Sequence, residues 1–463
     1  MYKKNQHIHF VGIGGIGMSG IAELLLNFRY CVSGSDLKET PITERLRKLG
    51  GTIYIGHRGD QVQGADVVVV SSAVRPDNPE VVAARAQNIP VIPRAEMLAE
   101  LMRMKYGIAV AGSHGKTTTT SLIATILAEG GMDPTMVIGG RLNSLGTNAK
   151  LGGGDFLVAE TDESDGSFLL LSPTVAVVTN IDPEHLDHYG EMESLIEAFV
   201  RFVSKVPFYG LVVLCLDHPN VRALLPQVRK RTVTYGLARQ ADFRAEDIQW
   251  NGWQSRFRVF FQKEELGEIH LRLPGIHNVS NALAAIAVAR ELELDFPVIQ
   301  RGLEHFAGIQ RRFQIKGQSQ GILVVDDYAH HPAEVLCTLA AARKGWEKRI
   351  VAVFQPHRYT RTQLCFEAFL GAFHDADVLI VLDIYPAGER ELHGIHASRL
   401  AEGIRKQGHK EVRYMGSFAE VLSFLHENCK EGDMVITLGA GDVVRIGEMF
   451  LGALEPKEER SAG

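Results

Sequence analysis

One recurring order of segments constrains the fold of this chain more than any other feature. A short apolar segment runs into a glycine-rich or polar turn and then into an apolar helix. It occurs at HIHFVGIGGIGMSGIAELLL from residue 7, at IAVAGSHGKTTTTSLIATILAEGG from residue 108, and at GILVVDDYAHHP from residue 321. Strands that alternate with helices pair in parallel, because each crossover must return the chain to the same edge. The sequence therefore predicts an α/β fold.

The length of the chain favours three consecutive α/β domains. At about 150 residues per domain, 463 residues exceed what a single core organises. We expect a Rossmann-like N-terminal domain at 1–105, a central P-loop ATP-binding domain at 106–310, and a Rossmann-like C-terminal domain at 311–463. From about Arg231 to Pro274 the pattern becomes strand-rich with polar alternation, which indicates a smaller β layer in the central domain.

Composition narrows the class of protein. The net charge of −6 offers no electrostatic case for nucleic acid or an anionic membrane. The five cysteines form no CxxC pair, which argues against a zinc site or a disulfide framework and fits a reducing compartment. Neither a secretory signal nor a run of about 18 apolar residues is present, so we expect a cytoplasmic protein without membrane insertion. Monomer and homodimer both remain open.

The strongest single motif is GSHGKTTTT, which lies between an apolar strand and an apolar helix. A glycine-rich turn at this point exposes backbone N–H groups at a helix N-terminus, where an anion is favoured. Lys116 would neutralise ATP phosphates, and Thr117 would offer a hydroxyl to Mg²⁺. The spacing departs from the ordinary P-loop, because only two residues separate its glycines instead of four. The expected ATP-binding residues are Gly112, Ser113, His114, Gly115, Lys116, Thr117 and Thr118.

Carboxylates that follow the next strands supply a candidate cation site. Glu160 ends the strand DFLVAE and opens an acidic run that includes Glu163. A carboxylate at the carboxyl end of a strand, beside a phosphate loop, is where a Mg²⁺ ligand would lie. His185 follows the strand VAVVTN and would complete a second cation site, although a lone loop histidine is more often a bystander.

The first glycine motif has the spacing of a dinucleotide fingerprint. Gly12, Gly14 and Gly17 read G-x-G-x-x-G, and Asp36 ends the second strand. The physics requires only a diphosphate at a helix N-terminus and a ribose near the acid, which a UDP-sugar supplies as well as NAD does. Ser71 and Ser72 end the following strand and would line the same crevice. With an ATP loop at residue 112, a nucleotide-activated substrate explains both motifs more economically.

These motifs in this order resemble the Mur ligase family, which builds the peptide stem of peptidoglycan in the bacterial cell wall. The resemblance covers essentially the whole chain and is strongest to the branch that adds L-alanine to UDP-N-acetylmuramate. It implies an ATP-dependent ligase, with Mg²⁺, that joins the two through an acyl phosphate and releases ADP and phosphate. The segments that carry it are GIGGIGMSG, SGSD, GSHGKTTT, NIDPEHLDHY, GIHNVSNALAA, RRFQ, DDYAHHPAE, FQPHRYTRT, YPAGE and LGAGD.

The resemblance also implies roles for individual residues in the first two domains. The UDP-sugar would be held by Gly14, Gly15, Gly17, Met18, Ser35 and Asp36. ATP and Mg²⁺ would be bound by Lys116, Thr117, Glu160 and His185, with adenine at His277, Asn278 and Asn281. Arg312 would reach the ATP phosphates, so the expected catalytic residues are Lys116, Glu160, His185 and Arg312, and the expected metal ligands are Thr117, Glu160 and His185.

In the C-terminal domain the resemblance implies recognition of the amino acid. The residues that follow its strands are Asp326, Asp327, Tyr328 and His330, and then His357, Arg358 and Arg361. Arg358 and Arg361 lie three apart at the start of a helix, so both would grip the α-carboxylate of L-alanine. We expect no carbamylated lysine bridging the metals.

Three alternatives stay open at this point. A ligase that recycles a whole tripeptide onto the same sugar nucleotide would share most of these motifs. An NAD-dependent oxidoreductase would use the first glycine motif but leave GSHGKTTTT unexplained. A P-loop switch or motor NTPase would leave both flanking α/β domains without a role.

Overall fold

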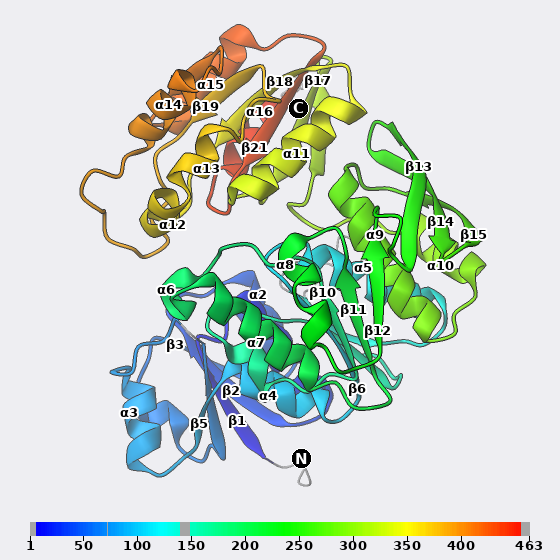
Figure 1. Cartoon of the computed structure of the whole chain (residues 1–463). Helices are drawn as coiled ribbons and strands as arrows, with labels where there is room; N and C mark the ends of the chain where they lie inside the picture. Colours follow the sequence, from blue (N-terminus) through cyan, green and yellow to red (C-terminus); the bar gives the residue numbers. More distant parts are fainter. Residues whose placement is uncertain (1–5, 72, 139–148, 455–463) are drawn as a thin grey trace, which may run out of the picture. The chain divides into compact units, whose positions relative to one another are not determined.

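The computed structural model describes residues 6–71, 73–138 and 149–454 of the chain. Within these ranges it contains three sheets, of five, ten and six strands, each accompanied by helices (Figure 1). The predicted succession of three α/β regions is confirmed. The described residues form two compact units, one made of Met1–Asp247, Phe257–His270 and Val279–Ala307, the other of Ile248–Arg256, Leu271–Asn278 and Gly308–Gly463.

The five-stranded sheet has the order β3-β2-β1-β4-β5, and all of its strands are parallel. The strand order reverses between β1 and β4, and ligands of open α/β sheets bind at this point, beyond the carboxyl ends of the strands. Its strands are β1 (His7–Val11), β2 (Cys31–Asp36), β3 (Thr52–Ile55), β4 (Val67–Val70) and β5 (Val91–Pro93). The connecting helices are α1 (Ile16–Asn27), α2 (Pro41–Lys48), 3₁₀-helix η1 (Gly59–Val62), α3 (Pro79–Ala86) and α4 (Arg94–Met102).

The ten-stranded sheet has the order β15-β14-β13-β12-β11-β10-β6-β9-β7-β8. Neighbouring strands from β12 through β10 and β6 to β7 pair in parallel. The apolar runs at β6 and β10 are buried along almost their whole length, as a sheet covered on both faces requires. Its strands are β6 (Tyr106–Ala111), β7 (Thr135–Val137), β8 (Ala149–Lys150), β9 (Phe156–Glu160), β10 (Val175–Val178), β11 (Leu211–Cys215), β12 (Thr232–Gly236), β13 (Phe243–Asn251), β14 (Gln254–Phe261) and β15 (Glu264–Leu271).

The strand-rich stretch predicted as a smaller β layer of the central domain joins this sheet. β12 joins β11 edge to edge, and β13 joins β12, both in parallel register. The helices of this region are α5 (Lys116–Glu129), η2 (Ser167–Leu170), α6 (Leu186–Tyr189), α7 (Met192–Ser204), α8 (Pro219–Arg222), η3 (Leu225–Gln227), α9 (Ile276–Glu291) and α10 (Phe296–Glu304). α10 packs closely on α5, because a Cβ at Gly302 would lie 3.0 Å from the Cα of Ile126.

The six-stranded sheet has the order β16-β17-β21-β18-β19-β20, with β16 antiparallel at one edge and the other strands parallel. Two separate buried clusters lie against it, one with α11, α13 and α14 and the other with α15 and α16. Its strands are β16 (Gln314–Ser319), β17 (Ile322–Asp327), β18 (Arg349–Phe354), β19 (Val378–Val381), β20 (Val412–Tyr414) and β21 (Asp433–Leu438). Its helices are α11 (Pro332–Gly345), α12 (Tyr359–Leu364), α13 (Phe366–Leu370), α14 (Ala397–Lys406), α15 (Phe418–Asn428) and α16 (Val444–Leu454).

Among the helices of the described residues, none combines the length and the apolar character that crossing a membrane requires.

Candidate active site

A pocket of about 770 Å³ opens at the switch point of the five-stranded sheet. It includes four of the residues expected to bind the sugar nucleotide, namely Gly14, Gly15, Asp36 and Ser71. Its other lining residues are Gly12, Leu37, His57, Ala73, Val74, Arg75, Asp77, Asn78 and Pro79. Ser72 lies outside the described residues. The position of the pocket beyond β1, β2 and β4 is the one expected for a nucleotide in a parallel sheet.

Asp36 shapes the glycine turn of this pocket. Its Oδ2 accepts a hydrogen bond from the backbone N–H of Gly14 at 2.8 Å. A Cβ at Gly14 would lie 2.8 Å from the same oxygen, closer than real side chains approach, so glycine is required there. One carboxylate oxygen of Asp36 is therefore committed to the turn.

Three residues expected at the sugar nucleotide lie away from the lining of this pocket. Ser35 is fully buried, and its hydroxyl donates to Glu80 Oε2 at 2.6 Å. Met18 is buried on α1, and Gly17 faces the side chain of Arg94, which a Cβ would approach to 2.9 Å. Side chains of a strand alternate between the two faces of the sheet, so Ser35 points inward where Asp36 reaches the pocket.

Sequence reasoning missed a buried carboxylate behind the pocket. Glu80 is fully buried and receives polar contacts from His9 Nε2 at 3.2 Å and His57 Nδ1 at 2.8 Å, besides Ser35. Burial would raise the pKa of Glu80, but the hydrogen bonds from His9 and Ser35 outweigh it and lower the pKa. His57 lines the pocket and lies just beyond the carboxyl end of β3, as Asp36 lies at the carboxyl end of β2, which is the sequence signal that would have identified it.

The lysine of the phosphate loop, Lys116, is surrounded by hydrogen-bond acceptors. Lys116 Nζ donates to Glu163 Oε1 at 2.8 Å and to the carbonyls of Gly112 and Ser113. Burial would lower the pKa of Lys116, but Glu163 and Glu160 outweigh it and raise the pKa. Lys116 is therefore a cation fixed at the N-terminus of α5, where a phosphate is favoured twice, by the charge and by the helix dipole.

The carboxylates near this loop fall into two groups. Thr117 Oγ1 donates to Glu160 Oε2 at 2.8 Å, which brings together two of the three expected Mg²⁺ ligands. His185 instead lies with Glu163 and Glu184, and the ligand atoms of these three residues all lie within 4.8 Å of one another. The acidic run and the DPEHLDH segment carried both glutamates, but sequence alone did not show which of them face His185.

The second group fits a divalent cation. Glu163 is buried, and its Oε2 has no hydrogen-bond partner among the described residues. A buried carboxylate oxygen without a partner is unfavourable unless something of positive charge satisfies it. Two carboxylates with one imidazole form a mixed oxygen and nitrogen donor set that divalent cations accept.

The first two turns of helix α9 hold the three residues expected at the adenine. The Oδ1 atom of Asn281 accepts a hydrogen bond from Thr119 Oγ1 at 3.2 Å. A Cβ at Gly115 would lie 2.5 Å from the same oxygen, so the side chain of Asn281 packs directly against the phosphate loop. Asn278 is buried and donates to Pro274 O at 2.7 Å. Burial lowers the pKa of His277 to about 4, with Arg312 adding to the effect. His277 is therefore neutral at pH 7.

The structure distinguishes the two arginines of RRFQ. Arg311 is engaged with the protein, because its guanidinium donates to Asp326 at 2.9 Å and to Gly439 O at 2.6 Å. Arg312 makes a looser contact, 3.6 Å from Glu334, and its guanidinium lies 5.4 Å from the ring centre of Tyr328. The role of Arg312 at the ATP phosphates stays a prediction.

Asp327 acts as an anchor of the chain in this structure. It is buried at the carboxyl end of β17 and accepts from the backbone N–H groups of Phe313 and Ala329, each at 2.7 Å. Burial raises the pKa of Asp327 to about 6, against the pull of Arg312. Both oxygens hold the backbone around the expected site, so its contribution to binding would be indirect.

Four of the residues expected to recognise the amino acid gather around β18. The ring of His330 lies edge-on to His357, with centroids 5.8 Å apart, and His357 stacks on Tyr385 at 5.6 Å. Arg361 Nη1 lies 3.3 Å from His357 Nδ1. Arg358 is held differently, because its Nε donates to Glu389 at 2.6 Å.

The stacked histidine is electrostatically coupled to its surroundings. Burial, together with the nearby His330 and Arg361, lowers the pKa of His357 to about 4. Sequence reasoning missed Tyr385 and Glu389 as site residues, although both lie in the YPAGE segment. Arg358 pairs with the carboxylate of Glu389. Among the described residues, Arg361 contacts His357 and no carboxylate.

The whole chain matches known proteins at the level of family. Residues 7–106 match the Mur ligase family catalytic domain, residues 110–289 the Mur ligase middle domain, and residues 311–441 the Mur ligase, glutamate ligase domain. A relative from Geotalea daltonii named UDP-N-acetylmuramate–L-alanine ligase is 61% identical over 451 residues, covering 97% of this chain and 98% of the relative. The protein of the same name from Geobacter sulfurreducens is 59% identical over 457 residues, covering 98% of this chain and 99% of the relative.

Solved structures give the same result. The UDP-N-acetylmuramate-alanine ligase from Thermotoga maritima superimposes with a TM-score of 0.82 at 32% identity, covering 97% of this chain and 99% of that chain. A murein peptide ligase from Psychrobacter arcticus superimposes with a TM-score of 0.70 at 26% identity, with the same coverage of both chains. The resemblance seen in the motifs is confirmed, and the chain belongs to the Mur ligase family of ATP-dependent, amide-bond-forming ligases.

Proposed function

We propose that this ligase joins L-alanine to the lactyl carboxylate of UDP-N-acetylmuramate, at the start of the peptide stem of peptidoglycan. The observation that carries the proposal is identity of about 60% over nearly the full chain to several proteins named for this reaction. The pocket at the switch point, the phosphate loop and the cluster around His357 offer one site for each of three substrates.

Activation of the carboxylate is the first chemical requirement, because amide formation in water is uphill. The lactyl carboxylate attacks the γ-phosphate of ATP, which gives an acyl phosphate and ADP. Lys116 would stabilise the charge on the transferring phosphoryl oxygens, and Arg312 would do so from the C-terminal domain. No side chain serves as a covalent nucleophile in this scheme, so catalysis rests on position and charge.

Amide formation follows by attack of the neutral amine of L-alanine on the acyl carbon. A tetrahedral intermediate forms and collapses, expelling phosphate. Arg361 would hold the α-carboxylate of alanine, since Arg358 is already paired with Glu389. Sequestering the acyl phosphate from water is necessary, because hydrolysis would waste the ATP.

We also propose Mg²⁺ as the cation, held by Thr117 and Glu160 and by the group of His185, Glu163 and Glu184. When bound, the metal would offset phosphate charge and orient the phosphate oxygens. We further propose domain boundaries at 105/106 and 310/311, a monomeric or homodimeric state, and a cytoplasmic location. The location rests on the use of ATP and a UDP-sugar, both of which are made inside the cell.

Phosphate release from ATP tests the proposed function directly. With Mg²⁺ and UDP-N-acetylmuramate present, each amino acid is added in turn, and release should be strongest with L-alanine. Release only with the tripeptide would assign the chain to the recycling reaction. Release that needs neither co-substrate would instead support an NTPase and contradict the proposal.

A further inference from the structure

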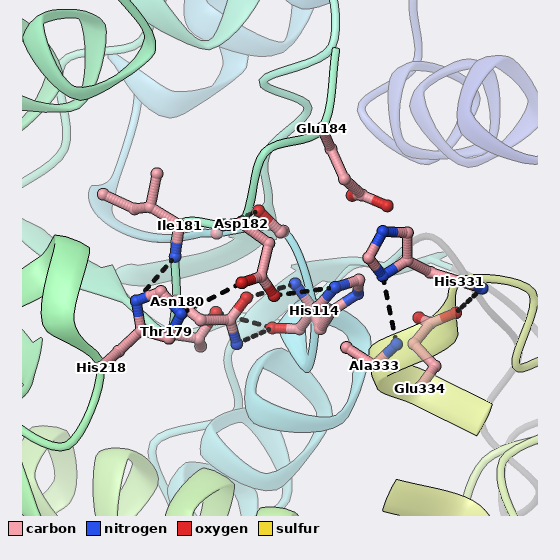
Figure 2. A network of polar contacts seen from close by, with 12 residues as sticks. His114, Thr179, Asn180, Ile181, Asp182, Glu184, His218, His331, Ala333 and Glu334 are labelled. Carbon is pink, nitrogen blue, oxygen red and sulfur yellow. Dashed lines mark hydrogen bonds and ion pairs between the residues drawn. The ribbon is translucent and has the colours of Figure 1, made fainter. Parts of the chain in front are cut away.

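The phosphate loop is short, and its shape is set by a second segment of chain. Ser113 N–H donates to Asn180 O at 3.1 Å, and His114 N–H donates to Asn180 Oδ1 at 2.6 Å. The carbonyl of His114 accepts from Thr179 Oγ1 at 2.7 Å and from Asn180 Nδ2 at 3.0 Å (Figure 2). A loop with only two residues between its glycines has few internal hydrogen bonds, so these external contacts determine its conformation.

The first glycine of the loop explains why the second segment can approach so closely. Gly112 has φ of +134°, in the region that favours glycine. A Cβ at Gly112 would collide with Thr179 Oγ1. The absence of a side chain at Gly112 therefore lets the segment after β10 lie directly against the loop.

Asp182 is the side chain at the centre of this contact. Its backbone N–H donates to Ser113 Oγ at 2.8 Å, and its Oδ2 lies 3.1 Å from His114 Nε2. Its other oxygen, Oδ1, lies 3.2 Å from His218 Nε2 (Figure 2). Burial would raise the pKa of Asp182, but the hydrogen bonds from His114 and His218 hold it well below its ordinary range.

His218 aims the carboxylate from the side opposite to the loop. Its Nδ1 accepts the backbone N–H of Ile181 at 3.4 Å, so the ring proton lies on Nε2 and points at Asp182. The neighbouring Asn220 donates to Ile181 O at 2.7 Å and ties the same turn to α8. One oxygen of the Asp182 carboxylate thus contacts His218, which directly precedes α8, and the other oxygen lies beside His114.

We propose that Asp182 is a positioning residue for ATP, acting through Ser113 and His114 of the phosphate loop. The inference deepens the proposed function and rests on the proposed ATP site at Lys116. Asp182 also lies two residues before Glu184 and three before His185, which has φ of +58°. Because Pro183 alone separates Asp182 from Glu184, a shift of Asp182 would move the phosphate loop and the cation ligands together.

The variant Asp182→Asn tests this role with little change of volume. A side-chain amide offers one acceptor oxygen and one NH2 donor group, so one of the two imidazole N–H groups would face a donor instead of an acceptor. We expect the Kd for ATP, measured by calorimetry, to rise about tenfold, the scale of one lost charge-assisted hydrogen bond. The Kd for UDP-N-acetylmuramate should stay unchanged, and kcat should fall by less than the KM for ATP rises.

A double-mutant cycle separates positioning from general loosening. If Asp182 acts through His114, the variants His114→Gln and Asp182→Asn should raise the Kd for ATP by similar factors, and the double variant by no more than either alone. His218→Gln removes only the outer contact and should give a smaller rise, so it serves if Asp182→Asn folds poorly. His270→Gln is the matched control, because it removes an exposed histidine that pairs with Glu268 at 2.9 Å.

Each outcome decides between the inference and the proposed function. Wild-type affinity for ATP in Asp182→Asn, or factors that multiply in the double variant, would overturn the positioning role. If Lys116→Ala loses ATP while Asp182→Asn keeps it, the ATP site stands and the inference alone fails. If Lys116→Ala binds ATP normally, the proposed nucleotide site is wrong, and the inference falls with it.

Discussion

Lys116 of the phosphate loop donates a hydrogen bond to the buried carboxylate of Glu163 at 2.8 Å. Glu163 is also one of the three residues that could share a cation with His185. The lysine that would bind the ATP phosphates and the carboxylate that would bind the metal are therefore partners in the structure. Binding of a magnesium nucleotide would give each group a new partner of opposite charge.

We predict that Lys116→Ala abolishes ligase activity and leaves binding of UDP-N-acetylmuramate intact. The change also removes the cation beside the buried Glu163, whose pKa burial already raises to about 7, and costs about 3 kcal/mol in free energy of unfolding. Phosphate release, sugar-nucleotide calorimetry and urea denaturation measure the three effects. The double variant Lys116→Ala with Glu163→Gln should recover part of the lost stability but none of the activity. Loss of UDP-sugar binding in the single variant would contradict the assignment of separate sites.

The pairing of Arg358 with Glu389 predicts unequal roles for the two arginines of FQPHRYTRT. Arg361→Ala should raise the KM for L-alanine at least about tenfold, because a charge-assisted contact to the α-carboxylate is lost. The KM for ATP should stay constant in steady-state assays.

Glu389→Gln provides the comparison for this prediction. It weakens the contact that orients Arg358 and should give a smaller rise in the KM for L-alanine than Arg361→Ala. Equal effects of Arg361→Ala and Glu389→Gln would mean that both arginines contact the amino acid.

The depressed pKa of His357 predicts a contribution to the pH dependence of stability. Its pKa is about 4 in the folded protein and about 6.5 when unfolded, so between these values the unfolded chain binds more protons. Its contribution is fully present above pH 6.5 and is lost as the pH falls towards 4, by up to about 3 kcal/mol. His357→Gln should therefore flatten the dependence of the denaturation midpoint on pH over this window. An unchanged slope would show that His357 does not titrate as inferred.

Gly14→Ala should weaken binding of the sugar nucleotide selectively. The new Cβ would lie 2.8 Å from Asp36 Oδ2, so either the glycine turn or the carboxylate must move at the pocket. We expect the KM for UDP-N-acetylmuramate to rise at least about tenfold, the effect of misplacing one charged hydrogen-bonding group. Gly452→Ala is the control, since nothing lies within 4 Å of its Cβ in α16, and it should stabilise the protein by about 0.5–1 kcal/mol.

Much of the architecture could be predicted from local patterns, because β–turn–α order leaves few parallel arrangements. The continuation of the central sheet through β12 and β13 could not. Polar alternation shows that one face of a strand is exposed, but not which strand lies beside it.

In the candidate site, too, some contacts could be predicted from the sequence and others could not. Lys116, Thr117 and Glu160 come together because a strand end and a helix N-terminus meet at one edge of the sheet. The family resemblance predicts both Ser35 and Asp36 at the ligand, whereas a strand sends these two neighbouring side chains to opposite faces of the sheet. The partners Glu163 and Glu184 of His185 depend on the path of two loops, which no short-range pattern specifies.

The buried carboxylate of Glu80 has one further consequence for the sugar-nucleotide pocket. It joins the start of α3 to strand β2 through Ser35, to β1 through His9, and to the loop after β3 through His57. Four stretches of chain are therefore locked together beneath the ligand surface during folding. The residues around the pocket are therefore ordered before a ligand binds. The conformational entropy lost on binding is then mainly that of the ligand and not of the protein.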